Sequence, residues 1–104
     1  MTARVVSSRA ADDDLFGIID YYRQAADAET AERFVDAVEA GIRRIADFPS
    51  AGSSSAEVRT GIPGLRSMTL DRFPYHLLYT MDDDAVRIHR VLHVRRDAER
   101  SFGD

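Results

Sequence analysis

Two segments in the first half of the chain carry apolar residues at the three- and four-residue spacing of amphipathic helices. In the first segment this spacing runs to about residue 26, through Ala11, Leu15, Ile18, Ile19 and Tyr22. Ser8 stands in front of it as a favoured N-cap, and Asp12–Asp14 lie near the positive end of the helix dipole. Gly17 lowers the helix propensity and is expected to allow close packing. The pattern predicts a first helix.

The second segment has a similar apolar stripe, made of Ala31, Phe34, Val35, Val38, Ile42 and Ile45. Phe48-Pro49 is expected to end it, because the residue before a proline avoids the helical region. The connection near Asp27–Thr30 is short, so the two helices are expected to form an antiparallel hairpin.

The second half of the chain has the period of strands. Residues 49–64 are rich in Ser, Gly and Pro and predict a long loop, and three β-type segments follow at 65–71, 75–81 and 85–93. Arg72-Phe73-Pro74 and Asp82-Asp83-Asp84 are turn sequences, which predicts an antiparallel meander. Residues 3–7 are expected to add a strand. The order β-α-α-β-β-β predicts a single α+β domain over 1–104, with a helical hairpin on one face of an antiparallel sheet.

Composition places the chain among ordinary globular proteins. It has 104 residues, of which 44% are hydrophobic and 31% charged. No apolar run reaches the roughly 18–20 residues of a membrane span, and the N-terminus does not resemble a signal peptide. The absence of cysteine excludes disulfides, a thiol nucleophile and cysteine-based metal sites. We therefore expect a cytoplasmic protein without a membrane partner.

The charges are unevenly distributed. All 14 basic residues are arginine, and the net charge is −4. Residues 1–57 hold six Arg and eleven acids (6 − 11 = −5), whereas residues 58–104 hold eight Arg and seven acids (8 − 7 = +1). The overall charge argues against non-specific binding of nucleic acid, but a local arginine patch in the second half remains possible.

Several motifs occur in a characteristic order. Asp47-Phe48-Pro49 is followed by Gly52, then by Gly64-Leu65-Arg66, by RFPYHLLY at 72–79 and by VRIHRVLHVRRD at 86–97. Together they resemble the ParE branch of the RelE/ParE toxin superfamily over nearly the whole chain. The ending RVLHVRRD is the most specific part, since the family commonly carries an R-V-x-H-x-x-R-D type ending there.

The resemblance implies a cytoplasmic toxin of a type II toxin–antitoxin system that needs no cofactor. It implies a ParD-like antitoxin as partner, which often represses the shared promoter, so that contact with DNA is only indirect. ParE-like members poison DNA gyrase, and RelE-like members cut messenger RNA on the ribosome. A degenerate toxin kept as a binding or regulatory module is a third alternative, which the sequence does not separate from the first.

The ribonuclease alternative lacks the expected side chains. RelE-like enzymes use lysines and arginines on the middle strands with a basic and aromatic ending, whereas this chain has Ser67 and Thr69 there and no lysine. Arg96 matches the arginine after the last strand, but Phe102 stands where a tyrosine is expected and has no hydroxyl. His76 and His93 remain the possible acid and base. We expect no catalytic residue.

Metal binding is also not expected. His89 and His93 are four residues apart, which on a strand separates them by about 13 Å, too far to share an ion. The run Asp82–Asp84 lacks the glycine and distal glutamate of a calcium loop, so a hairpin turn is the better interpretation.

Arg90 stands out on the last strand. Strict alternation would place it on one face with Val86, Ile88, Leu92 and Val94. Either a bulge turns it outward or it pairs with a carboxylate such as Asp71 or Asp97, or it lines a groove that receives a carboxylate of the antitoxin. The candidate residues for binding the target or the antitoxin are Arg66, Arg72, His76, Arg90, His93, Arg95 and Arg96.

Overall fold

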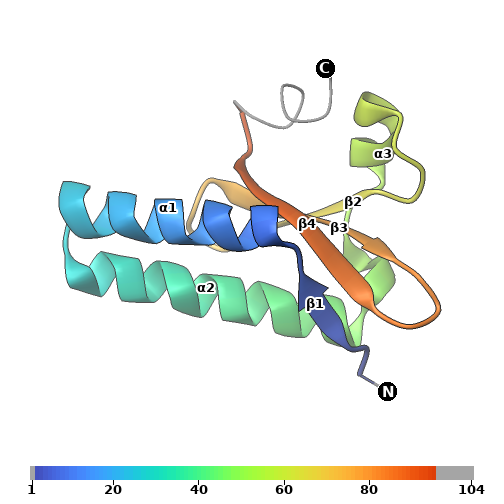
Figure 1. Cartoon of the computed structure of the whole chain (residues 1–104), viewed down its shortest axis with the longest axis horizontal. Helices are drawn as coiled ribbons and strands as arrows, with labels where there is room; N and C mark the ends of the chain where they lie inside the picture. The colour runs from blue at the N-terminus through green and yellow to red at the C-terminus, as the bar shows by residue number, and fades with distance from the viewer. Residues whose placement is uncertain (1, 96–104) are drawn as a thin grey trace.

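The computed structural model describes residues 2–95, which form a four-stranded sheet with two long helices on one face and a short helix on the other (Figure 1). In chain order the elements are β1 (Val5–Ser7), α1 (Arg9–Ala25), α2 (Ala28–Asp47), the 3₁₀ turn η1 (Pro49–Ala51), α3 (Ser55–Thr60), β2 (Arg66–Thr69), β3 (Tyr75–Met81) and β4 (Val86–His93). The predicted α+β class and the helical hairpin are confirmed.

The helix boundaries follow from local capping. Ser8 accepts a hydrogen bond from the backbone N–H of Ala11 at 3.0 Å, as the sequence predicted, and Asp27 caps α2 through Thr30 N at 2.7 Å. A two-residue link therefore reverses the chain between the helices. Gly17 meets no neighbour within 4 Å, so the expectation of close packing there is wrong. Gly41 has that role, because a methyl group on it would lie 3.1 Å from Leu70.

The sheet order is β1-β4-β3-β2, and the predicted meander of β2, β3 and β4 is antiparallel. β1 joins in parallel to β4, with Val5 opposite Val86, so the sheet is mixed rather than wholly antiparallel. The reason is topological. A hairpin of two helices returns the chain to the end where it started, so β2 runs in the direction of β1, and two further reversals give β4 that direction again.

The main core fills the space between the sheet and the two long helices. Its largest fully buried side chains are Tyr79, Phe34, Ile45, Leu77, Val86 and Val91. Four aromatic rings pack together at one end of it, those of Tyr22, Phe34, Phe73 and Tyr75, with centroids 5.3–6.4 Å apart; the Tyr22–Phe34 pair is tilted and the other pairs meet edge to face. This cluster ties both helices to the turn between β2 and β3.

The segment predicted as a loop at 49–64 contains η1 and α3 instead. Ala56 of α3 packs with Leu65, Leu78 and Leu92 in a second, smaller core on the other face of the sheet. Ala56 makes most of the buried apolar contact of α3. A helix with one buried apolar residue has no apolar stripe, so the sequence does not predict it.

Tyr79 anchors the start of this segment. Its hydroxyl donates to the carbonyl of Pro49 at 2.7 Å and accepts from the buried N–H of Gly52 at 2.9 Å. Residue 52 must be glycine, because a Cβ there would approach the Tyr79 hydroxyl to 2.3 Å. One phenol thus satisfies two backbone groups of the connection, the N–H of Gly52 and the carbonyl of Pro49.

Tyr79→Phe should lower the free energy of unfolding by about 1–3 kcal/mol, because it leaves Gly52 N–H and Pro49 C=O buried without their partner. Urea denaturation followed by circular dichroism measures the change. Tyr21→Phe is the control, since Tyr21 is exposed and its change should stay within about 0.5 kcal/mol. Equal stability of the two variants would show that the phenol is not needed to hold the connection.

Candidate partner-binding site

A bulge in β4 determines where Arg90 lies. Tyr79 pairs with Ile88 and Leu78 pairs with Arg90, so His89 is an additional residue in β4 that has no opposite number on β3. Ile88 therefore faces the helices, whereas Arg90 shares the register of Leu78 on the other face. The expected single face through Val86, Ile88, Arg90, Leu92 and Val94 is wrong beyond Ile88, because the bulge shifts the alternation by one.

Arg90 is held by a carboxylate of the first helix. Its Nε and Nη2 donate to the two oxygens of Asp14 at 2.8 and 2.9 Å, and the backbone N–H of Val91 donates to Asp14 at 3.0 Å. The two side chains are only 29% and 16% exposed. Both structural expectations for Arg90, a bulge and an ion pair, are thus met, but the partner is Asp14. Asp71 pairs with Arg44 instead, and Asp97 lies outside the described residues.

α1 consequently covers the edge of β4 that β1 leaves unpaired. β1 pairs with β4 only as far as Ile88. Beyond that point Ser8 bonds the edge of β4: its backbone N–H donates to the carbonyl of Ile88 at 2.9 Å, and its hydroxyl donates to the carbonyl of His89 at 2.8 Å. Asp14 receives the next available N–H, that of Val91. Side chains of a helix here replace a neighbouring strand.

A groove follows this line between α1 and the end of β4. It has a volume of about 520 Å³ and is lined on the helix side by Asp13, Gly17 and Tyr21 and on the strand side by Arg90 and His93, with further residues of both elements. A second hollow of about 500 Å³ adjoins it and shares three lining residues, Tyr21, Tyr75 and His93. Because they share these lining residues, we describe the two hollows together as the α1–β4 groove.

Aromatic rings give the groove its character. The Tyr75 and His93 rings meet edge to face at 5.5 Å, and Tyr21 stands against Tyr22 at 5.4 Å while remaining 60% exposed. Burial, followed by the neighbouring Tyr75, raises the pKa of Tyr22, so that phenol stays neutral at physiological pH. Arg90 and His93 of this groove are predicted from the sequence, whereas Tyr21 and Tyr75 are not predicted as site residues. The adjacent pair Tyr21-Tyr22, of which only one can face the core, was the available signal.

Four of the other predicted site residues, Arg66, Arg72, His76 and Arg95, are not among the residues that line this groove. Arg66 donates to the carbonyls of Ser50 and Gly52 at 3.2 and 2.9 Å and so braces the connection after α2. Arg72 lies exposed in the turn between β2 and β3, at a φ of 68°. Arg95 is exposed just after β4, and Arg96 lies outside the described residues. The arginines of residues 58–95 are therefore dispersed rather than gathered into one patch.

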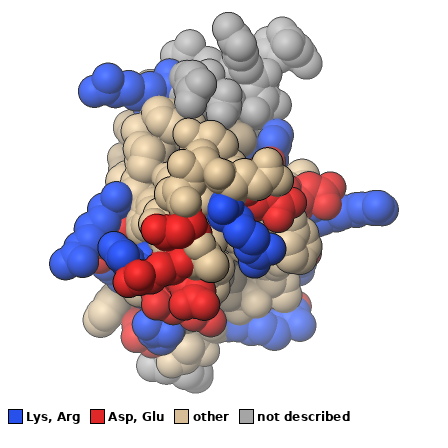
Figure 2. All heavy atoms as spheres, turned by 90° about the vertical axis from the view of Figure 1, so that its left-hand side faces the viewer, with Lys and Arg blue, Asp and Glu red and all other residues tan. Residues whose placement is uncertain are grey.

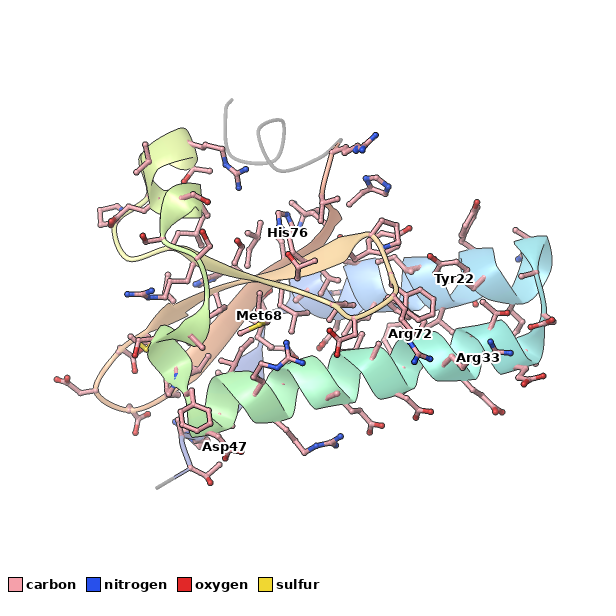
Figure 3. The ribbon with its side chains drawn as sticks, turned by 180° about the vertical axis from the view of Figure 1, so that it is seen from behind. Tyr22, Arg33, Asp47, Met68, Arg72 and His76 are labelled. Carbon is pink, nitrogen blue, oxygen red and sulfur yellow. The ribbon has the colours of Figure 1, made fainter. Side chains whose placement is uncertain are left out.

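The two histidines considered for catalysis lie on opposite faces. His76 pairs with Leu92 and shares the face of Leu78, whereas His93 pairs with Tyr75, whose ring packs on the helix side. Figure 3 shows His76 on the side of the sheet away from α2, with Met68 on the side toward it. His76 is also buried. The arrangement does not place an acid and a base on either side of one phosphate.

The aspartate run forms a hairpin turn, as predicted. Asp82 accepts from the backbone N–H groups of Asp84 and Ala85 at 2.9 and 2.8 Å and from Arg87 Nε at 2.7 Å. These bonds, that from Arg87 first, lower the pKa of the Asp82 carboxyl to about 2. His89, for its part, bonds Thr80 through Nε2 at 2.8 Å. Within residues 2–95, no group of three or more His, Asp or Glu side chains is arranged to hold a metal ion.

The charge on the surface is mixed. Figure 2 looks onto the end of the helical hairpin and shows acidic side chains gathered there among arginines. The exposed acids near this end are Asp20, Asp27, Glu29 and Glu32, and Arg33 pairs with Glu29 at 3.0 Å. Such a surface does not suit a nucleic acid backbone, which needs a continuous basic stripe.

Asp14→Ala should lower the free energy of unfolding by about 2 kcal/mol, because it leaves the half-buried guanidinium of Arg90 and the N–H of Val91 without this carboxylate. Asp13→Ala is a matched control on the same helix turn, since Asp13 is exposed. Chemical denaturation compares the two. Equal losses would show that the carboxylate does not hold α1 against β4.

Comparisons with known proteins agree with this architecture. Among solved structures, a chain described as "Chromosomal ParDE TA system from P. aeruginosa" superposes with a TM-score of 0.76 at 23% identity and covers 90% of this chain and 98% of that one, which shows a shared fold. A search of curated proteins finds no match. No helix within residues 2–95 is long and apolar enough to cross a membrane. Residues 5–98 match the sequence profile of the family described as ParE toxin of type II toxin–antitoxin system, parDE, and the chain therefore belongs to this toxin family.

Proposed function

We propose that this toxin acts by binding DNA gyrase rather than by cutting RNA, and that a ParD-like antitoxin neutralises it by occupying the α1–β4 groove. The toxin would work in the cytoplasm, where gyrase is, and would meet promoter DNA only through its antitoxin. The observation that carries the proposal is the combination of a large aromatic groove with histidines that face apart.

The covered edge of β4 favours a helix over an added strand as the form of the antitoxin segment that binds there. The edge of β4 is taken by Ser8 and Asp14. The outer edge of β2 is met by Ser53, whose N–H and C=O both bond Ser67. A helix needs only side-chain pockets, whereas an added strand needs a free row of backbone groups. The groove supplies aromatic surface for such a helix.

The arginines support a target that is a protein. Arg66 and Arg90 are engaged by groups of the chain itself, and Arg87 pairs with Asp82. Ribonucleases of the related kind need basic side chains free to stabilise charge on a phosphate. His76, which could move a proton, has a buried ring. Recognition of a protein surface needs neither free basic side chains around a phosphate nor a histidine that transfers a proton.

Purified toxin should inhibit DNA supercoiling by purified gyrase or trap its cleaved-DNA complex, and prior addition of the antitoxin should restore supercoiling. A ribosome assay with mapped mRNA ends runs in parallel. Unimpaired gyrase together with codon-specific mRNA cuts would replace this target by the ribosome, and growth without arrest in cells expressing the toxin alone would indicate a degenerate toxin.

Tyr21→Ala should weaken antitoxin binding at least about tenfold, because exposed aromatic side chains in a groove are typical binding hot spots. Arg43→Ala, an exposed change on α2 outside the groove, should leave the Kd unchanged. Isothermal titration calorimetry gives both constants. Tight binding by both variants would place the antitoxin elsewhere on the toxin.

A further inference from the structure

Gly17 occupies a helix interior that gives it no structural role among the described residues. It lies halfway along the 17 residues of α1. Glycine is the least favourable residue of a helix interior apart from proline, because its backbone loses the most freedom on folding. Gly41 of α2 is explained by its close approach to Leu70, but a Cβ on Gly17 would meet nothing within 4 Å. The packing of the toxin itself therefore does not require glycine at position 17.

The missing side chain leaves a notch in the wall of the α1–β4 groove. Gly17 lines this groove, together with its neighbour Ile18 and with Val91 of β4. Asp13 lies four residues before Gly17 and Tyr21 four residues after it, so each is about 6 Å from the glycine along the helix axis. Residues four apart share one face of a helix. The helical wall of the groove thus presents a carboxylate, a gap and an aromatic ring in that order.

The charge of this wall indicates the chemistry of its occupant. Asp13 is exposed and has no hydrogen-bond or ion-pair partner within residues 2–95. The adjacent Asp14 is bound by Arg90, so Asp13 is the carboxylate of this wall that a partner can meet. An amphipathic helix complements the wall when it carries a basic residue one turn away from a large apolar residue, because both then lie on the same face.

We infer that the antitoxin helix inserts a large apolar side chain into the notch at Gly17 and places a basic side chain, one turn away, against Asp13. This contact rests on the proposed binding of the antitoxin in the α1–β4 groove and adds which residues fit each other there. Packed helices insert side chains of one into gaps on the other, and the absent Cβ widens the gap. The filled notch offsets the helix propensity that Gly17 costs the free toxin. Gly17 is thus a specificity-determining residue, which selects antitoxins with a bulky residue at the matching position.

Substitutions at Gly17 should change stability and antitoxin binding in opposite directions. Gly17→Ala should raise the midpoint of thermal unfolding of the free toxin by about 4–8 °C, because alanine favours the helix and its methyl group has open space. It should weaken binding of the full-length cognate antitoxin about fivefold, and Gly17→Leu, which fills the notch, about a hundredfold. Differential scanning calorimetry and isothermal titration calorimetry measure the two quantities. Since both variants are expected to be at least as stable as the unaltered toxin, misfolding would not explain their weaker binding.

Gln24→Leu is the matched control, because Gln24 is exposed on the same helix and does not line the groove, so the Kd should stay unchanged. Asp13→Lys tests the charged part of the contact. It should slow association with the antitoxin about tenfold at low salt and less at high salt, since a charge at the rim of an interface acts chiefly on the association rate. An association rate that Asp13→Lys leaves unchanged would contradict the basic residue opposite Asp13.

Failure of this contact and failure of the proposed groove give different results. If Tyr21→Ala weakens binding while Gly17→Leu binds as tightly as the unaltered toxin, the antitoxin occupies the groove without using the notch, and the contact at Gly17 is wrong. If neither change weakens binding, the groove is not the antitoxin site and the contact falls with it. A lower unfolding midpoint in Gly17→Ala would also overturn the inference, because the glycine would then serve the toxin's own fold.

Discussion

The carboxylate of Asp14 joins the two parts of this fold that the chain itself keeps far apart. It bonds the guanidinium of Arg90 and the backbone of Val91, 76 and 77 residues along. Together with the bonds of Ser8 to Ile88 and His89, it attaches the beginning of α1 to β4. The covered end of the β4 edge and one wall of the α1–β4 groove depend on this contact. The groove is therefore built on a polar clamp that lies over an apolar core.

A sheet with a core on each face divides the molecule into two functional sides. The side of the long helices buries the larger set of residues and is tied by the aromatic cluster and by Gly41. The side of α3 buries four residues and leaves an imidazole nitrogen unmet. The side of the long helices also presents the α1–β4 groove, which we propose as the antitoxin site.

Periodicity sufficed for the parts of the fold that repeat. The apolar stripes of 11–22 and 31–45 predict the hairpin, and the Ser8 cap, the meander and both turns follow from local residue types. Features without a repeating residue pattern are not predicted from the sequence. Ala56 is the one fully buried residue of α3, and the bulge at His89 has no local signature. The parallel entry of β1 is a property of the whole chain path and of no single segment.

The site was predicted in part, for the same reason. Arg90 was recognised as exceptional because a charge interrupted an apolar row, but its partner could not be identified from spacing, since Asp14 reaches it only through the packing of α1. Arg66 was assigned to binding because arginines often contact partners, whereas here two carbonyls occupy it. Spacing alone gives Tyr21 no special role on its helix. Its place beside Tyr75 in the groove depends on the packing of α1 against the sheet.

The additional residue at position 89 sets the face that each later residue of β4 takes. It has no opposite number on β3, although its ring bonds Thr80. A strand of the same length without the bulge would turn over everything after Ile88, carrying the arginine at 90 toward the helices and the valine at 91 to the other face. Loss of this one residue would instead give a regular strand with the present pairs, so a deletion here should be tolerated better than a deletion elsewhere in β4.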